Sequence, residues 1–392
     1  MTKADRAADV IIIGLGAMGS AAAYHLAARG CSVIGFDQFA PPHSLGSSHG
    51  RSRIFRQSYW EDPRYVPLLL RASELWRKLE HDAGESLLQI TGGLAIGHQG
   101  SALVAGSAES ARLFHLPHQI LDAAEIKRRY PMFFVESDTI ALLEENAGYL
   151  DPERCVAAHL REAARMGAEL YINSPVEEWT ASHRGGGTVR TAAGLYSGDQ
   201  LVITAGPWAP RVLAQLNLPM RVTRQVACWF EPGASLDYFR RDRLPVYLFE
   251  AEPGQRIVYG FPLTGPPDEG VKVAIHGSDE FCTADTVDRE VRPADVELLR
   301  RRLEQAVPLL NGRLLHAETC VYTMTPDEHF ILDVHPEHNS VYLAAGFSGH
   351  GFKFAPVIGE IIADRLLDRS AHFDLELFSI DRFRNLQRPE ES

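Results

Sequence analysis

A chain of 392 residues is long enough for two domains, because single hydrophobic cores usually stop growing near roughly 250–300 residues. Its 45% hydrophobic and 23% charged residues are ordinary for a globular protein. The net charge of −12, without any run of lysines or arginines, argues against nucleic acid as a partner. No stretch of about 18 apolar residues is uninterrupted, which argues against a membrane-spanning helix.

Cysteine usage and the two ends of the chain indicate a cytoplasmic protein. The cysteines form an odd, sparse set without a CxxC pair, which favours reduced thiols over a disulfide framework. The apolar amino-terminal segment is not expected to be a secretory signal, because Asp9 precedes it and patterned glycines interrupt it. The carboxyl end, PEES, matches no address signal.

Residues 9–37 predict a strand, a tight turn, a helix and a second strand. Val10–Ile13 is a continuous apolar run, as in a central parallel strand that is buried on both faces. A GxGxxG pattern follows. Gly14 permits the tight turn, Gly16 lets the backbone approach a pyrophosphate, and Gly19 lets the helix and strand pack closely. The second strand ends at Asp37, placed to accept hydrogen bonds from a ribose. This pattern predicts a dinucleotide site but does not distinguish FAD from NAD.

The middle of the chain alternates two kinds of structure. Helices are predicted within 64–84 and 151–171, the second running into a strand at 168–172; a further strand is predicted within 87–97, and a strand, turn and helix over 199–216. From about 216 to 318 the pattern changes to short alternating strands separated by proline and glycine. Residues 340–367 return to strand, glycine-rich turn and helix.

The α/β segments therefore lie at the start, middle and end of the chain. A nucleotide domain assembled from distant pieces suits a flavoprotein better than an NAD dehydrogenase, which usually completes that domain in one block. We expect an α/β protein, α+β overall, with a discontinuous FAD-binding domain and a sheet-rich antiparallel substrate domain. The expected FAD-binding segments are 1–88, 145–216 and 319–388, and the substrate domain comprises 89–144 and 217–318.

Two groups of basic residues are candidates for chemistry. His49, Arg51, Arg53 and Arg56 cluster after the dinucleotide unit, where guanidinium groups could bind a carboxylate or favour an anionic reduced cofactor. A solvated loop paired with surface acids is the alternative. On the predicted strand 271–276, Lys272 shares a face with His276; a lysine on an open sheet face is usually solvated.

Residues 320–354 concentrate cysteine, aspartate and histidine. Read alone, this segment fits a metal site, a covalent attachment point or the polar rim of a sheet. Asp333, His335 and His338 have plausible ligand spacing, but Pro336 lies among them and no cysteine is adjacent, so no metal is predicted. For Cys320, a buried apolar cysteine is the alternative.

The whole chain resembles the family of monomeric sarcosine oxidase and N-methyltryptophan oxidase, which are FAD-dependent amine oxidases. Several long motifs carry the resemblance in the family's order: GSSHGRSRIFR, YGFP, VKVAIH, CVYTMTPDEHFILDVHPEH and AAGFSGHGFKF. The fold that it implies is a Rossmann-like FAD-binding domain of the glutathione-reductase and D-amino-acid-oxidase type.

The resemblance also implies roles for individual residues. Cys320 would form a thioether to the 8α-methyl group of FAD, and His329, His335 and His338 would be structural. Lys272 would activate oxygen on the flavin face opposite the substrate, in a catalytic set of Lys272, Arg53, His49 and His276. The substrate would be bound by Arg56 and Lys353 as a carboxylate clamp, with Tyr259, Tyr322, Gly349 and Leu248. The implied cofactor-binding residues are Gly14, Gly16, Ala17, Met18, Gly19, Asp37, Gln38, His49, Arg53, Val176, Gly206, Trp208, Cys320, Gly349, Gly351 and Lys353.

The sequence departs from the family pattern at four places. Arg51 replaces an acid, Gln57 a histidine and Trp60 a small residue, and two residues are added between Tyr259 and Lys272. We expect these changes to affect substrate size and shape rather than the reaction type.

The expected activity is oxidation of a secondary amino acid such as sarcosine, with O₂ as acceptor, hydride transfer to flavin N5, and release of formaldehyde and hydrogen peroxide. A monomer whose partners are a small amine and O₂ is expected. Alternatives are a flavin dehydrogenase that reduces a protein or quinone, and an enzyme for a cyclic amine such as pipecolate or a bulkier substrate such as N-methyltryptophan. Others are an NAD dehydrogenase and a non-catalytic flavin-binding module.

Overall fold

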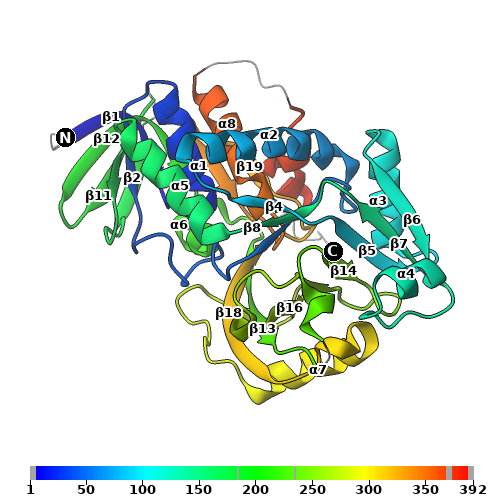
Figure 1. Ribbon diagram of the computed structural model, residues 1–392. Coiled ribbons are helices and arrows are strands. Elements are labelled where there is room, and N and C mark those ends of the chain that lie inside the picture. The colour runs from blue at the N-terminus through cyan, green and yellow to red at the C-terminus, as the bar shows by residue number, and fades with distance from the viewer. Residues whose placement is uncertain (1–5, 183–184, 234, 368–372, 387–392) are drawn as a thin grey trace, which may run out of the picture.

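The computed structural model describes residues 6–182, 185–233, 235–367 and 373–386, so the carboxyl-terminal PEES lies outside the described residues. The first of its large sheets has eight strands in the order β10-β11-β12-β1-β2-β9, with β20 beside β12 and β19 beside β20 (Figure 1). The bounds are β1 (Arg6–Ile13), β2 (Val33–Phe36), β9 (Glu169–Tyr171), β10 (Glu178–Ala181), β11 (Gly187–Thr191), β12 (Gly194–Ile203), β19 (Ile331–His335) and β20 (His338–Ala345).

Strand β1 forms the buried centre of this sheet and pairs in parallel with β2 and β12. Because side chains alternate along a strand, Val10 and Ile12 pack with the helices on one face, while Ile11 and Ile13 pack with Tyr196 on the other. Burial on both faces explains why the strand reads as a continuous apolar run.

A layer of helices packs on one face of this sheet, and α2 packs on α5 and α8 of that layer (Figure 1). Helix α1 contacts α5 and α8, and α2 contacts α8. Asp151 caps α5 by accepting a hydrogen bond from the backbone N–H of Arg154 at 3.0 Å, as its position before Pro152 predicts. The bounds are α1 (Ala17–Ala28), α2 (Val66–Ala83), α5 (Pro152–Arg165) and α8 (Ala355–Leu366).

The second large sheet has nine strands in the order β17-β13-β16-β15-β14-β5-β7-β6, with β18 beside β13. Its pairs are antiparallel except for β14 with β5. Helix α7 packs on β13 and β16 through Leu299 and Leu303. The bounds are β5 (Gly93–His98), β6 (His118–Asp122), β7 (Thr139–Glu144), β13 (Arg221–Phe230), β14 (Val246–Phe249), β15 (Val258–Gly260), β16 (Val271–Ile275), β17 (Phe281–Cys282), β18 (Leu314–Met324), α3 (Ala102–Leu113), α4 (Ala123–Arg129) and α7 (Pro293–Ala306).

A small three-stranded sheet, β3-β8-β4, joins segments that are far apart in the chain. Strand β3 pairs with β8 from Arg53 opposite Leu150 to Phe55 opposite Gly148. This pairing anchors the predicted basic loop beside the two large sheets. The bounds are β3 (Arg53–Phe55), β4 (Leu88–Ile90) and β8 (Gly148–Leu150).

Three expectations from the sequence are wrong in detail. Residues 87–97 form two strands, β4 and β5, in different sheets, because Gly92 with φ +76° turns the chain between them. The helix predicted to continue to residue 216 is reduced to α6 (Ala209–Val212), with 3₁₀ turns at Gly206–Trp208 and Ala214–Leu216. The segment 216–318 contains α7, whose apolar positions cover one face of the sheet.

The α/β start and end of the chain and the antiparallel character of 221–282 agree with the predicted architecture. The domain boundaries proposed from the sequence stay a prediction. None of the helices within the described ranges has the length and apolar character needed to cross a membrane.

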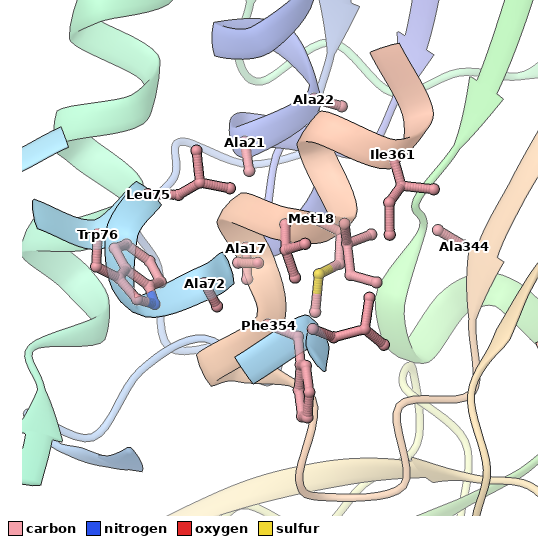
Figure 2. Packing of buried hydrophobic residues seen from close by; sticks show 14 of the residues in the cluster. Ala17, Met18, Ala21, Ala22, Ala72, Leu75, Trp76, Ala344, Phe354 and Ile361 are labelled. Carbon is pink, nitrogen blue, oxygen red and sulfur yellow. The ribbon is translucent and has the colours of Figure 1, made fainter. Parts of the chain in front are cut away.

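Helices α1 and α8 each begin at a glycine-rich turn and pack against each other. Figure 2 shows Ala17, Met18 and Ala21 of α1 beside α8. A Cβ atom on Gly359 of α8 would lie 2.5 Å from the carbonyl carbon of Ala21. Backbone cannot yield as a flexible side chain does, so the two helices would have to separate.

We therefore expect Gly359→Ala to lower the free energy of unfolding by about 1–3 kcal/mol, despite the better helix propensity of alanine. Urea unfolding measures this change. Gly233→Ala is the matched control, because its Cβ would meet only the Leu309 carbonyl oxygen, at 3.8 Å. Equal stability of the two variants would contradict the close helix contact.

Candidate active site

One cavity of about 600 Å³ extends from the turn after β1 to the buried cations Arg56 and Lys353. Its volume lies in the usual range for a small-molecule or cofactor site. Of the cofactor-binding residues predicted from the sequence, these line the cavity: Gly14, Gly16, Ala17, Met18, Asp37, Gln38, Arg53, Val176, Gly206, Trp208, Gly349, Gly351 and Lys353. The others, Gly19, His49 and Cys320, are not in the lining.

The turn after β1 is built by close backbone contacts. Gly14 has φ +96°, and a Cβ there would lie 2.5 Å from the Thr204 carbonyl oxygen. A Cβ on Gly19 would lie 1.8 Å from the carbonyl oxygen of Gly14, so only glycine lets α1 start this close to β1. The amino-terminal end of α1 therefore lines the cavity, where its dipole favours anionic groups.

Asp37 lies at the end of β2, as the sequence predicts. Its Oδ2 accepts a hydrogen bond from the Leu15 N–H at 2.8 Å, and its Oδ1 accepts one from the Phe39 N–H at 2.9 Å. Each carboxylate oxygen keeps a further lone pair, so Asp37 can stabilise the turn and still accept a ribose hydroxyl.

These observations fit a dinucleotide of the size of FAD. The glycine turn leaves backbone free of side chains, the helix dipole suits a pyrophosphate, and the acid suits a ribose. Val176, Gly206 and Trp208 line the cavity next to these groups. The same cavity continues beyond Arg53 to the substrate-binding residues predicted from the sequence, so one enclosed space joins the two predicted sites.

Lys272 is 2% exposed, which overturns the solvated alternative. It lies on β16, and its Nζ donates hydrogen bonds to the carbonyl oxygens of Gly50 and Ser52, at 2.6 and 2.9 Å. Burial lowers the pKa of Lys272 well below its ordinary value, and Arg53 lowers it further, while Glu318 opposes.

Gly50 has φ +100°, and its missing side chain leaves a point where three charged groups meet. A Cβ at Gly50 would be 3.0 Å from Glu318 Oε1, 3.1 Å from Arg53 Nη1 and 3.2 Å from Lys272 Nζ. The opposite charges of Glu318 and the two cations partly compensate in this enclosed position.

His49 and Cys320 lie next to this charged group. Neither ring nitrogen of His49 hydrogen-bonds within the described part of the chain, and Nδ1 lies 3.7 Å from Glu318 Oε1. Burial alone would lower the pKa of His49, but Cys320 and Glu318 raise it to about 9. Burial would raise the pKa of Cys320, but His49, with Arg53, lowers it to about 7. The arrangement favours a thiolate, which is the reactive form of cysteine.

Arg56 and Lys353 come together at the far end of the cavity, and both lie over the ring of Tyr59. Arg56 is paired with the carboxylate of Glu61, whose Oε2 has no hydrogen bond within the described residues. Burial would raise the pKa of Glu61, but Arg56 and His350 lower it to about 2. Burial lowers the pKa of Lys353 to about 7, with a further contribution from Arg56.

Most of the other side chains that line this end are aromatic or aliphatic. Gly349 has φ +78°, and a Cβ there would lie 2.4 Å from the Tyr322 ring, so glycine is required where the turn meets that ring. Burial lowers the pKa of His276 to about 4, which keeps its imidazole neutral. The lining includes Trp60, Glu61, Leu248, Ile257, Tyr259, Phe261, His276 and Tyr322.

The sequence interpretation missed Glu61, Tyr59 and Glu318. Glu61 follows Arg56 by five residues in an irregular loop, so no helical or strand period relates the two. Glu318 reaches the charged group only because β18 pairs with β13 next to β16. Its strand position, two residues before Cys320 on the same face, is the one signal that the sequence offers.

The histidines of the segment 320–354 are dispersed by the fold. His329 lies beside Tyr65 and His350 beside Tyr59, while His335 and His338 contact each other with tilted rings, 4.8 Å between centroids, at the β19–β20 hairpin. Over the described residues, no cluster of three or more His, Cys, Asp or Glu side chains could hold a metal ion.

Known proteins of similar sequence and structure indicate the family to which this chain belongs. A family model described as FAD dependent oxidoreductase matches residues 9–365. Monomeric sarcosine oxidase of Streptomyces avermitilis is 48% identical, with 94% of this chain and 96% of that protein covered. N-methyl-L-tryptophan oxidase of Yersinia pestis is 34% identical, with coverage of 96% and 99%. The structure of L-proline dehydrogenase from P. horikoshii shares the fold, with a TM-score of 0.83, 22% identity and coverage of 98% and 100%.

These matches confirm the resemblance and the FAD-binding fold that the sequence indicates. Together with a cavity that fits the dinucleotide, they show that this chain belongs to the family of FAD-dependent oxidoreductases, beside the monomeric sarcosine oxidases and N-methyl-L-tryptophan oxidases.

Proposed function

We propose that the protein oxidises a secondary N-methyl amino acid, such as sarcosine, with O₂ as the electron acceptor. The observation that carries the proposal is the pair of buried cations, Arg56 and Lys353, at the apolar end of the cavity. The names of the relatives support the same substrate class.

The charges at this end suit a carboxylate ligand. Arg56 and protonated Lys353 carry two positive charges, and Glu61 contributes one negative charge. A substrate carboxylate therefore brings the group to neutrality in an environment where unpaired charge is costly. Because Glu61 now pairs with Arg56, binding requires the substrate carboxylate to replace or share that contact.

The neighbouring groups suit a neutral amine. A secondary amine bound as its ammonium form must lose one proton before the nitrogen lone pair can assist removal of hydride from the adjacent carbon. His276 is neutral and lines the cavity, so it can accept a hydrogen bond from the amine N–H without adding a charge. The imine product then hydrolyses in water and releases formaldehyde from an N-methyl group.

FAD, when bound, would supply the hydride acceptor and pass the electrons to O₂, giving hydrogen peroxide. Cys320 would hold it through a thioether, for which the thiolate favoured by His49 is the reactive form. Lys272 would stabilise negative charge as O₂ is reduced, because negative charge that develops beside the buried amine favours its protonated form, which then acts with little screening.

The activity can be tested by a peroxide-coupled screen of the purified protein with sarcosine, N-methyltryptophan and pipecolate. We expect turnover with an N-methyl amino acid and no turnover with its N-methyl amine analogue lacking the carboxylate. Rapid reduction of dyes with little peroxide would instead indicate a dehydrogenase.

For the tether, Cys320→Ala should abolish covalent flavin while the cavity still binds FAD. Acid-precipitated wild-type protein is expected to give a yellow pellet, and the variant a white pellet with a yellow supernatant. Cys282→Ala, on the edge strand β17, is the matched control and should keep the yellow pellet. A yellow pellet from Cys320→Ala would refute the tether.

For oxygen activation, Lys272→Met should slow flavin reoxidation by about 10²-fold or more, while anaerobic reduction by substrate changes far less. Stopped-flow absorbance measures the two half-reactions separately. Lys78→Met, at an exposed position of α2, serves as the control. Equal losses in both half-reactions would exclude a specific role with oxygen.

A further inference from the structure

Tyr59 occupies the point between the two cations of the carboxylate clamp. Its side chain is fully buried, and the Arg56 Cζ atom lies 4.0 Å from the ring centroid. The Lys353 Nζ atom lies 5.1 Å from the same centroid and donates a hydrogen bond to the Tyr59 hydroxyl at 3.4 Å. One side chain therefore contacts both groups, through its ring face and through its oxygen.

The direction of the Tyr59 hydroxyl is determined by His350. His350 Nε2 lies 2.9 Å from the carbonyl oxygen of Glu328, which can only accept, so Nε2 carries the proton. Burial lowers the pKa of His350 to about 3, so the ring is neutral and Nδ1 is an acceptor. The Tyr59 Oη, 2.6 Å from Nδ1, must therefore donate to it. The lone pairs of Oη then remain for Lys353.

The ammonium of Lys353 is held on two sides. Besides Tyr59 Oη, it donates a hydrogen bond to the His350 carbonyl oxygen at 2.7 Å. The Trp76 Nε1–H donates to the Lys353 carbonyl oxygen at 2.9 Å, which also fixes the backbone. With two N–H bonds engaged, the third is left to donate to a ligand in the cavity.

We propose that Tyr59, oriented by His350, is a positioning residue for the carboxylate clamp: its ring holds Arg56 in place, and its hydroxyl aims the Lys353 ammonium and stabilises its charge. This inference rests on the proposed function, because it assumes that Arg56 and Lys353 bind the substrate carboxylate. Tyr59 itself acts through these two cations.

The inference predicts a change in pH dependence. The charged and titratable groups that face Lys353 are Arg56 and Glu61 from the segment after β3, His350 from the turn before α8, and His276 after β16. Lys353 is charged below its lowered pKa of about 7, so its contribution to carboxylate binding is lost as the pH rises through that value. Removing the Tyr59 oxygen takes away an acceptor, which lowers this pKa further and moves the loss to lower pH.

The test is titration of the holoenzyme with propionate, a carboxylate without an amine, followed by the flavin absorbance across pH. Tyr59→Phe keeps the ring and its contact with Arg56 but removes the hydroxyl. We expect propionate binding at neutral pH to weaken about fivefold and its pH midpoint to fall. With substrate, KM should rise about fivefold, and the limiting rate of flavin reduction should change by less than about twofold.

Tyr65→Phe is the matched control, because Tyr65 is also fully buried and its hydroxyl also pairs with a histidine, His329, at 3.1 Å. It should leave the propionate affinity and its pH midpoint unchanged. If Tyr59→Phe does not fold, His350→Leu removes the acceptor that directs the hydroxyl and should shift the midpoint in the same direction.

Lys353→Met distinguishes a failure of the carboxylate clamp from a failure of the positioning role of Tyr59. If it binds propionate as the wild type does, the carboxylate clamp itself is wrong, and the proposed function loses its main support. If Lys353→Met weakens binding but Tyr59→Phe behaves as Tyr65→Phe does, the clamp stands and the role of Tyr59 is overturned.

Discussion

Buried positive charge is the constraint on which the active site depends. Lys272, Arg56 and Lys353 are almost completely removed from solvent where the two large sheets approach each other. A cation in such a place is tolerated only when acceptors or counter-ions satisfy its donors. The loop after the dinucleotide unit meets this need with its own carbonyl groups, so the loop and the cations stabilise each other. The carbonyl oxygens of Gly50 and Ser52 accept hydrogen bonds from Lys272, and that of Ser58 accepts one from Arg56.

The cations divide into two groups with different compensation. Near β16, Lys272 has Glu318 beside it, and the same carboxylate raises the pKa of His49. At the other end of the cavity, Arg56 pairs with Glu61, while the hydrogen bonds that Lys353 donates within the described residues go to neutral acceptors of His350 and Tyr59. Each group keeps a net positive charge, and the second, which lines the cavity, suits an anionic substrate. The first suits stabilisation of a transient negative charge.

The departures from the family pattern differ in whether they line the cavity. Arg51 pairs with Glu269 at 2.8 Å on the surface, so a changed residue contacts the lengthened loop. Arg51 and Glu269 are not part of the cavity lining, and neither is Gln57, which is buried and whose backbone N–H donates to Glu144 Oε1 at 2.7 Å. Trp60 lines the cavity, so of the three substituted positions it is the one placed to alter the shape of the substrate-binding end.

The sequence by itself determined the dinucleotide unit, because a continuous apolar strand, three spaced glycines and a terminal acid constrain the backbone locally. It also indicated the discontinuous α/β architecture and, by resemblance, which residues to look for. Only the tertiary structure brought Lys272, Glu318 and Gly50 to one point and placed Tyr59 between Arg56 and Lys353. Such contacts join residues up to about three hundred positions apart, through strand pairing and turn geometry that local periodicity does not encode.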